Sequence, residues 1–166
     1  PMNANAARKA FVANRVGDFA MIMAMILTFW SFGSLEFIPV FDHVIEIFEH
    51  SEMVQFAGTN IPMSLGTVLT AITALFLLVA ACKSAQIPLY VWLPDAMAGP
   101  TPVSALIHAA PMVTSGIYLI VRSNVMFEIV REIVSDTGGP LVFGFVPAPD
   151  LVAIVGAVTA LLAGLN

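Results

Sequence analysis

Charged side chains are scarce in this chain. Asp, Glu, Lys and Arg make up 10% of its 166 residues, and 59% of the residues are hydrophobic. A soluble domain carries about 25% charged residues. We therefore expect most of the surface to face lipid or other apolar protein. The formal net charge of −5 also argues against a nucleic-acid partner, because nucleic-acid-binding proteins present basic faces.

Cysteine is almost absent, and so are the motifs of cofactor chemistry. The single cysteine, Cys82, excludes a disulfide framework and a cysteine-based zinc or iron–sulfur site. The sequence contains no GxGxxG motif, no P-loop, no metal-ligand cluster and no nucleophile with a base at suitable spacing. We therefore expect no cofactor, metal or redox centre in this chain.

Long apolar runs are what the chain has instead. A helix needs about 20 apolar residues to cross a bilayer core of about 30 Å. Spans are predicted near 16–33, 65–93 and 103–122, with a fourth near 150–166 that the chain end truncates. Helices are expected because every backbone polar group must be paired inside lipid. The predicted fold class is all-α, a polytopic transmembrane helix bundle.

Two further segments, near 39–56 and 124–136, have amphipathic patterns. In the first, Val40, Val44 and Phe48 recur at helical spacing opposite several acidic residues. Such a helix lies at the membrane surface or against a neighbouring subunit, and its acidity favours a protein partner. We also expect the chain to be an internal part of a longer protein, because it starts at a proline and stops directly after an apolar run.

Lys83 is the strongest functional signal. A lysine inside an apolar stretch costs several kcal/mol unless it finds a partner or water or loses its proton. The alternative is that Lys83 ends the helix and extends to the interface, but residues 87–93 are apolar again. Pro88 lacks an N–H and clashes with the carbonyl of Ser84, so a helix break is predicted around 83–88. Broken helices at membrane depth line cavities, and this pattern predicts a proton-carrying lysine.

A polar stripe marks the third predicted span. Ser104, His108 and Ser115 lie four and seven residues apart, on one helical face. His108 suits a proton relay, although a histidine that is merely hydrogen-bonded between packed helices remains the alternative. Because Lys83 and His108 differ in predicted depth, we expect water to bridge them through Ser104 or Gln86.

The remaining polar positions have simpler interpretations. Asp18 follows Arg15 by three residues, so it either tunes a neighbouring proton site or neutralises Arg15. Asp95 follows a proline and is interpreted as a helix cap. Trp92 and Tyr90 are interpreted as packing or interface residues.

Four stretches of this chain resemble one protein family. Residues 83–97, KSAQIPLYVWLPDAM, and 99–110, GPTPVSALIHAA, closely resemble the signature of the L subunit of respiratory complex I. Residues 8–11, RKAF, and 14–19, NRVGDF, resemble the preceding helix of that family. Subunits of Mrp-type antiporters share much of this pattern. Gly99 before Pro100 and the Leu-Ile pair before His108 look more like the complex I version.

The resemblance implies roles for three residues. Lys83 would be the central proton-carrying lysine of a broken helix, His108 the relay histidine, and Asp18 an acid near the channel entrance. Two features depart from the family pattern: the loop 34–63 looks longer than usual, and Pro111 stands where the family usually has threonine.

The expected function is a proton-translocating membrane subunit of NADH:quinone oxidoreductase, which couples quinone reduction to proton pumping. The expected partners are the other membrane-arm subunits and the lipid bilayer, with NADH, FMN, iron–sulfur clusters and quinone bound elsewhere in the complex. The expected location is a bacterial plasma membrane, or a mitochondrial inner membrane if the protein is organellar. The alternatives are an Mrp-type cation/proton antiporter subunit, a hydrogenase-type membrane-arm subunit, and a scaffold span without an ion path.

Overall fold

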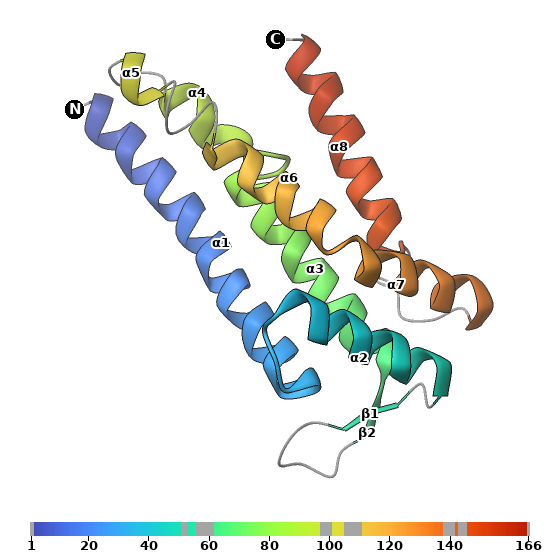
Figure 1. The fold of residues 1–166 in the computed structure, drawn as a ribbon. Coiled ribbons are helices and arrows are strands. Elements are labelled where there is room, and N and C mark those ends of the chain that lie inside the picture. Colours follow the sequence, from blue (N-terminus) through green and yellow to red (C-terminus); the bar gives the residue numbers. More distant parts are fainter. Residues whose placement is uncertain are drawn as a thin grey trace. The chain divides into compact units, whose positions relative to one another are not determined.

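A computed structural model describes residues 2–50, 53–55, 62–96, 101–104, 111–137, 142 and 146–165. These residues are mainly helical (Figure 1). The elements in chain order are α1 (Met2–Phe32), α2 (Phe37–His50), β1 (Met53–Gln55), β2 (Pro62–Ser64), α3 (Leu65–Lys83), the 3₁₀-helix η1 (Tyr90–Trp92), α4 (Leu93–Ala96), α5 (Thr101–Val103), α6 (Val113–Arg122), α7 (Asn124–Thr137) and α8 (Ala148–Leu165). The predicted fold class, an all-α transmembrane bundle with a broken helix, is confirmed, with one short strand pair added.

Three of the described helices are long and apolar enough to cross a membrane. They are Ala4–Phe32 within α1, Leu65–Lys83 and Ala148–Leu165. Helices α6 and α7 pass the same test only as a pair. The predicted apolar run starts at residue 16, but helix α1 begins at Met2. The segment before residue 16 is rich in alanine and basic residues, which are good helix formers.

The second long helix ends at Lys83 and does not continue to Leu93. The chain turns through residues 84–89 before η1 and α4 resume helical structure. Ala85 takes a left-handed backbone conformation, with φ of 50°, and the Ile87–Pro88 peptide bond is cis. The discontinuity at 84–89 therefore overlaps the segment 83–88 for which the proline pattern predicted it.

The third predicted span, 103–122, is described only at its two ends. Helix α5 ends at Val103, α6 begins at Val113, and residues 105–110 lie outside the described residues. His108 is among the residues outside this description, so its position remains a prediction. Ser104 and Pro111 are described.

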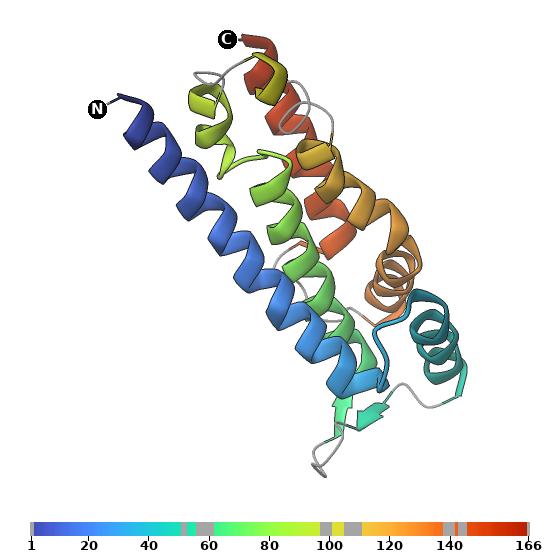
Figure 2. The ribbon, with the colours of Figure 1, turned by 60° about the vertical axis from the view of Figure 1, so that its left-hand side comes forward.

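The chain divides into two compact units. The first comprises residues 1–21, 76–121 and 154–166. Within it, the first part of α1 runs alongside the end of α3 (Figures 1 and 2). Two glycines permit the close approach of helices: a Cβ on Gly17 would lie 2.7 Å from the Cβ of Cys82, and one on Gly116 would lie 2.8 Å from the Cα of Ala80. Small residues at such contacts are typical of packed membrane helices.

The second unit comprises residues 22–75 and 122–153. Within it, α2 is in contact with α7, and both helices contribute buried apolar residues, including Val40 and Val44 from α2 and Phe127 and Val130 from α7. The amphipathic segment predicted over 39–56 is helical only to His50. Strands β1 and β2 pair antiparallel, with Val54 opposite Met63, and this hairpin was not anticipated from the sequence.

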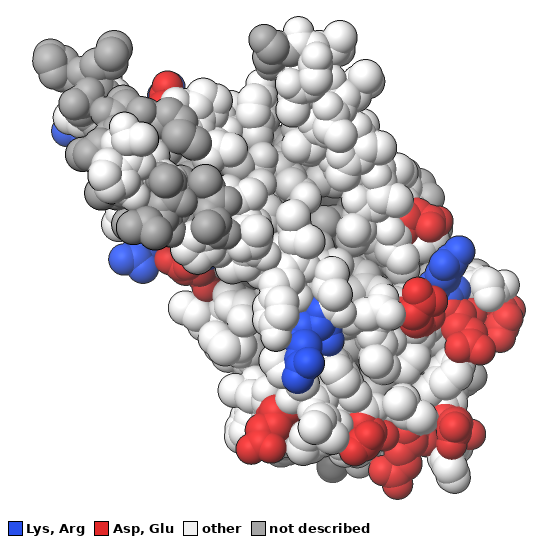
Figure 3. All heavy atoms as spheres, turned by 45° about the horizontal axis from the view of Figure 1, so that its top comes forward, with Lys and Arg blue, Asp and Glu red and all other residues white. Residues whose placement is uncertain are grey.

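Charged side chains are sparse on the face of the protein drawn in Figure 3. Figure 3 shows a broad uncharged expanse interrupted by small groups of acidic and basic side chains. Large apolar side chains are exposed along the membrane-length helices, including Phe19 and Phe29 on α1 and Leu161 and Leu165 on α8. This distribution fits helices that contact lipid or other membrane protein.

Candidate functional site

The most prominent polar contact of the first unit joins two membrane-length helices. Lys83 Nζ at the end of α3 lies 2.6 Å from Asp18 Oδ1 on α1. The other carboxylate oxygen of Asp18 accepts a longer contact of 3.4 Å from Arg15 Nη1. The side chains of Lys83 and Asp18 are 27% and 37% exposed, and that of Arg15 is 65% exposed. One carboxylate is therefore shared by a tightly held lysine and a more exposed arginine.

The end of α3 is closed by a left-handed helix cap. The N–H of Ser84 donates to the carbonyl of Ala80, and the N–H of Gln86 donates to the carbonyl of Ala81. The second bond spans six residues around Ala85, which has positive φ. This is the arrangement of a Schellman motif, with alanine at the position that glycine usually occupies. The cap stops the helix directly after Lys83.

The next free carbonyl of this helix end receives a side-chain donor. Trp92 Nε1 lies 3.0 Å from the carbonyl oxygen of Cys82 and donates to it. Trp92 is fully buried and packs with Ala13 of α1 and Ala85 in a small apolar cluster. A residue interpreted from the sequence as packing or interface is thus a hydrogen-bond donor inside the protein.

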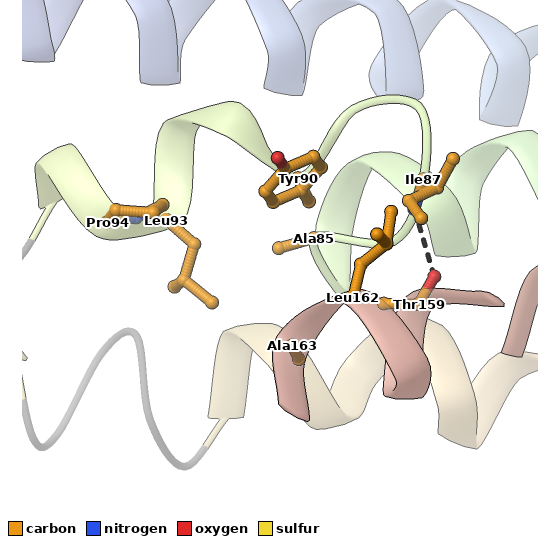
Figure 4. Close-up of a pocket in the computed structure, with 8 residues that line it drawn as sticks. All are labelled: Ala85, Ile87, Tyr90, Leu93, Pro94, Thr159, Leu162 and Ala163. Atoms are coloured by element: carbon orange, nitrogen blue, oxygen red, sulfur yellow. Dashed lines mark hydrogen bonds between the residues drawn. The ribbon is translucent and has the colours of Figure 1, made fainter. Parts of the chain in front are cut away.

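Two further hydrogen bonds tie the break to α6 and α8. The hydroxyl of Ser84 donates to the carbonyl of Val113. The N–H of Ile87 donates to Thr159 Oγ1 at 3.2 Å, and the same hydroxyl donates to the carbonyl of Val155 at 2.6 Å. Figure 4 shows the Ile87–Thr159 contact. The threonine hydroxyl thus satisfies a backbone N–H that the break frees, as a site inside a bilayer requires.

An apolar cavity of about 230 Å³ adjoins the break. It lies between the chain after α3 and one face of α8 (Figure 4). Its lining residues are Ala85, Ile87, Tyr90, Leu93, Pro94, Thr159, Leu162 and Ala163. Thr159 Oγ1 is one of the few polar atoms here, so this cavity does not resemble a polar proton path.

A second ion pair connects α1 to the chain beyond the break. Lys9 Nζ lies 2.7 Å from Asp95 Oδ2, and the two side chains are 58% and 39% exposed. Asp95, interpreted from the sequence as a helix cap, therefore has a basic partner on α1. Helix α1 thus provides Asp18 as the partner of Lys83 before the break, and Lys9 as the partner of Asp95 after it.

The residues predicted to form the site are only partly brought together. Lys83 and Asp18 are in direct contact, whereas Gln86 contributes backbone hydrogen bonds to the break. Ser104 Oγ is buried and has no hydrogen-bond partner among the described residues. His108 lies outside the described residues. Bridging between it and Lys83 stays a prediction.

Sequence reasoning named Asp18 as a candidate but did not assign it as the partner of Lys83. Lys83 required a partner, and Asp18 is the one acid within the first predicted span. The same reasoning also missed Asn14, which lies one helical turn before Asp18. Asn14 Oδ1 is buried and has no hydrogen-bond partner among the described residues. No group of three or more histidine, cysteine or acidic side chains in the described part of the chain could hold a metal ion.

Comparison with known proteins places this geometry in a family. Residues 1–165 match the profile of the transmembrane family described as NADH:quinone oxidoreductase/Mrp antiporter. The chain belongs to this family. The match confirms the resemblance drawn from the motifs around Lys83 and His108, and family membership and the three candidate spans together make this a membrane protein.

Curated relatives of the family carry informative names. The chain is 48% identical over 162 residues to NADH-quinone oxidoreductase subunit L of Mycobacterium tuberculosis, which covers 97% of this chain and 20% of the relative. It is 43% identical over 163 residues to the chloroplastic NAD(P)H-quinone oxidoreductase subunit 5 of Liriodendron tulipifera, covering 98% of this chain and 18% of the relative. The corresponding protein of Ranunculus macranthus is 40% identical over 162 residues, with the same coverage. The chain spans about a fifth of the length of these relatives.

The contacts group two basic side chains around one carboxylate. The Lys83 ammonium and the Arg15 guanidinium share Asp18, so the three charged groups carry one net positive charge. A carboxylate close to an intramembrane lysine offsets much of the cost of that charge in lipid.

Proposed function

We propose that this chain is part of a proton-translocating membrane subunit of NADH:quinone oxidoreductase, in which Lys83 carries the proton. The observation that supports this most directly is the Lys83–Asp18 contact at the broken end of α3. A lysine can gain and lose a proton, whereas arginine stays charged. In this proposal the redox reaction takes place in other subunits of the complex, where NADH, FMN, iron–sulfur clusters and quinone bind.

In the proposed cycle, Asp18 acts as the counter-charge that holds Lys83 in its protonated state. Weakening of that contact, with Asp18 retained by Arg15, favours release of the proton from Lys83. His108 then receives the proton through water, with Ser104 and Gln86 as the candidates to hold that water. The hydroxyl of Ser104 supports this assignment, because it is buried, has no hydrogen-bond partner in the part of the chain that the structure describes, and such a group needs one.

The partners in this proposal are the other membrane-arm subunits of the complex and the surrounding lipid. The membrane is a bacterial plasma membrane or its organellar counterpart. The relatives named above come from both a bacterium and chloroplasts, so the family occurs in more than one kind of membrane.

Substitution of Lys83 in the intact complex tests the proposal. Lys83→Ala and Lys83→Arg are both expected to lower proton pumping at least ~10-fold, because a few kcal/mol of transition-state stabilisation is lost with the exchangeable proton. The measurements are pumping and quinone reduction in membrane vesicles, normalised to assembled complex. Lys9→Arg is the matched control, since it keeps the charge of an exposed, ion-paired lysine. Wild-type pumping by assembled Lys83→Arg complex would contradict the proposal.

An Mrp-type cation/proton antiporter is the second candidate, because the family profile covers both groups of proteins. The two differ in their driving reaction. A subunit of the oxidoreductase pumps protons when NADH is oxidised. An antiporter instead exchanges protons for sodium ions when a sodium gradient is imposed, in the absence of NADH. Vesicles that hold the complete protein distinguish these outcomes directly.

A further inference from the structure

We infer that Trp92 is a positioning residue for Lys83, acting through the hydrogen bond from its indole N–H to the carbonyl of Cys82. The inference rests on the proposed role of Lys83 and adds a residue to that site. Trp92 is fully buried, and its N–H lies 3.0 Å from the oxygen of the residue directly before Lys83.

The Cys82 carbonyl needs this donor because of where it lies. Carbonyls in the last turn of a helix have no partner within the helix, and inside a bilayer water does not replace them. In a Schellman motif the carbonyl at this position is ordinarily satisfied by the backbone. Here the indole approaches it, which extends the cap beyond the two backbone bonds of Ser84 and Gln86.

The bond also decides where Lys83 points. Cys82 is fixed from one side by Gly17, where there is no room for an added Cβ, and from the other by the indole of Trp92. With both sides of the preceding residue held, the Lys83 side chain leaves α3 toward Asp18. An indole N–H is a hydrogen-bond donor and cannot accept. The indole nitrogen of Trp92 therefore binds the Cys82 carbonyl but does not compete with Asp18 as an acceptor for the Lys83 ammonium.

Packing alone is the other explanation for a buried tryptophan. Trp92 does pack against Ala13 and Ala85, so removal of the whole ring would test packing and hydrogen bonding together. Tryptophan in membrane proteins is also enriched at the interface, where its N–H meets water. The N–H of Trp92 instead meets a backbone carbonyl inside the protein, and an experiment that changes only that atom separates the two explanations.

The experiment replaces Trp92 with 3-benzothienylalanine in the full-length subunit of the intact complex. This side chain has nearly the shape of indole but carries sulfur in place of the N–H. 5-Fluorotryptophan at the same position keeps the N–H, and 3-benzothienylalanine at Trp30 is the matched control. Lys83→Ala serves as the reference for the proposed function. If the first variant assembles poorly, 2-naphthylalanine provides a second ring system without an N–H.

We expect 3-benzothienylalanine at position 92 to lower pumping and maximal quinone reduction per assembled complex by roughly tenfold, the order expected for an unsatisfied buried carbonyl. The KM for quinone should not change, because the site lies in a chain that holds no quinone in the proposed function. Maleimide labelling of the buried Cys82, followed by mass spectrometry, should accelerate as the helix end loosens. The fluorinated variant should match wild type in all three measurements, and the Trp30 control should leave the labelling of Cys82 unchanged.

The outcomes separate the two proposals. Wild-type pumping and labelling with 3-benzothienylalanine at position 92, together with loss of pumping in Lys83→Ala, would overturn the role of Trp92 alone. Wild-type pumping in Lys83→Ala would overturn the proposed function. An equal loss with the fluorinated variant would show that ring packing, rather than the N–H, is what matters.

Discussion

Lys83 and Asp18 lie 65 residues apart in the chain, and their charged atoms are 2.6 Å apart in the structure. Each comes from a different membrane-length helix, α3 and α1. The pair is only partly buried. Its contribution to the free energy of folding therefore lies between that of a buried ion pair, which has a large desolvation cost, and that of a fully exposed pair, which is small.

The first prediction concerns Asp18. Asp18→Asn keeps the shape of the side chain but removes the charge that stabilises protonated Lys83. We expect quinone-coupled pumping to fall roughly 5- to 10-fold, equivalent to about 1 kcal/mol for a partly exposed charge pair. Pumping in vesicles with equal amounts of assembled complex measures the effect.

The matched control for this variant is Arg15→Gln. Arg15 makes the longer contact with Asp18 and is more exposed, so its removal should change pumping less than Asp18→Asn does. A larger effect from Arg15→Gln would mean that the arginine, not the lysine, is the functional partner of this carboxylate.

The second prediction concerns the close approach of α1 and α3. Gly17→Ala places a Cβ 2.7 Å from the Cβ of Cys82, so the helices must separate. We expect a loss of about 1–3 kcal/mol in stability, the usual cost of overpacking, seen as a lower temperature of half-inactivation of the complex. Gly156→Ala is the control, because nothing lies within 4 Å of its added Cβ.

A second substitution can rescue this clash only if it removes the opposing atom. Gly17→Ala combined with Cys82→Gly should recover part of the lost stability, because the Cβ of Cys82 is gone. Cys82→Ala retains that Cβ and should give no rescue. Equal behaviour of the two double variants would argue against this contact.

The third prediction concerns the pair Lys9–Asp95. Lys9→Glu and Asp95→Lys each place like charges together, whereas the double variant restores an ion pair with reversed polarity. For side chains this exposed, we expect a coupling of about 0.2–1 kcal/mol that weakens in high salt. A double-mutant cycle on thermal inactivation at low and high salt measures it. Additive effects of the two single changes would show that the ion pair contributes nothing.

Much of the fold follows from local properties of the sequence. The apolar run from Leu65 and the proline at position 88 predict a membrane-length helix that breaks soon after Lys83, because hydrophobic length and the missing proline N–H act within a few residues. The hairpin β1–β2 does not follow in this way. Its strands are only three residues long, and such pairs depend on context more than on propensity.

The site was less predictable than the fold because its contacts join distant segments. That Lys83 needs a partner follows from the cost of its charge, but the choice of Asp18 depends on how α1 and α3 are aligned, which Gly17 helps to set. Trp92 was assigned to packing or an interface because indole is common in both. Only the position of its N–H reveals a third use.

The hydrogen bonds at the end of α3 have a consequence for how the subunit is made. The donors and acceptors that complete the break are synthesised well after Lys83: Trp92 follows Cys82 by 10 residues, Val113 follows Ser84 by 29, and Thr159 follows Ile87 by 72. A nascent chain that has delivered only α1 and α3 to the membrane therefore carries unpaired peptide groups at the break, which lipid does not tolerate. Biogenesis must keep this segment in the insertion machinery, or in contact with water, until α8 has been translated.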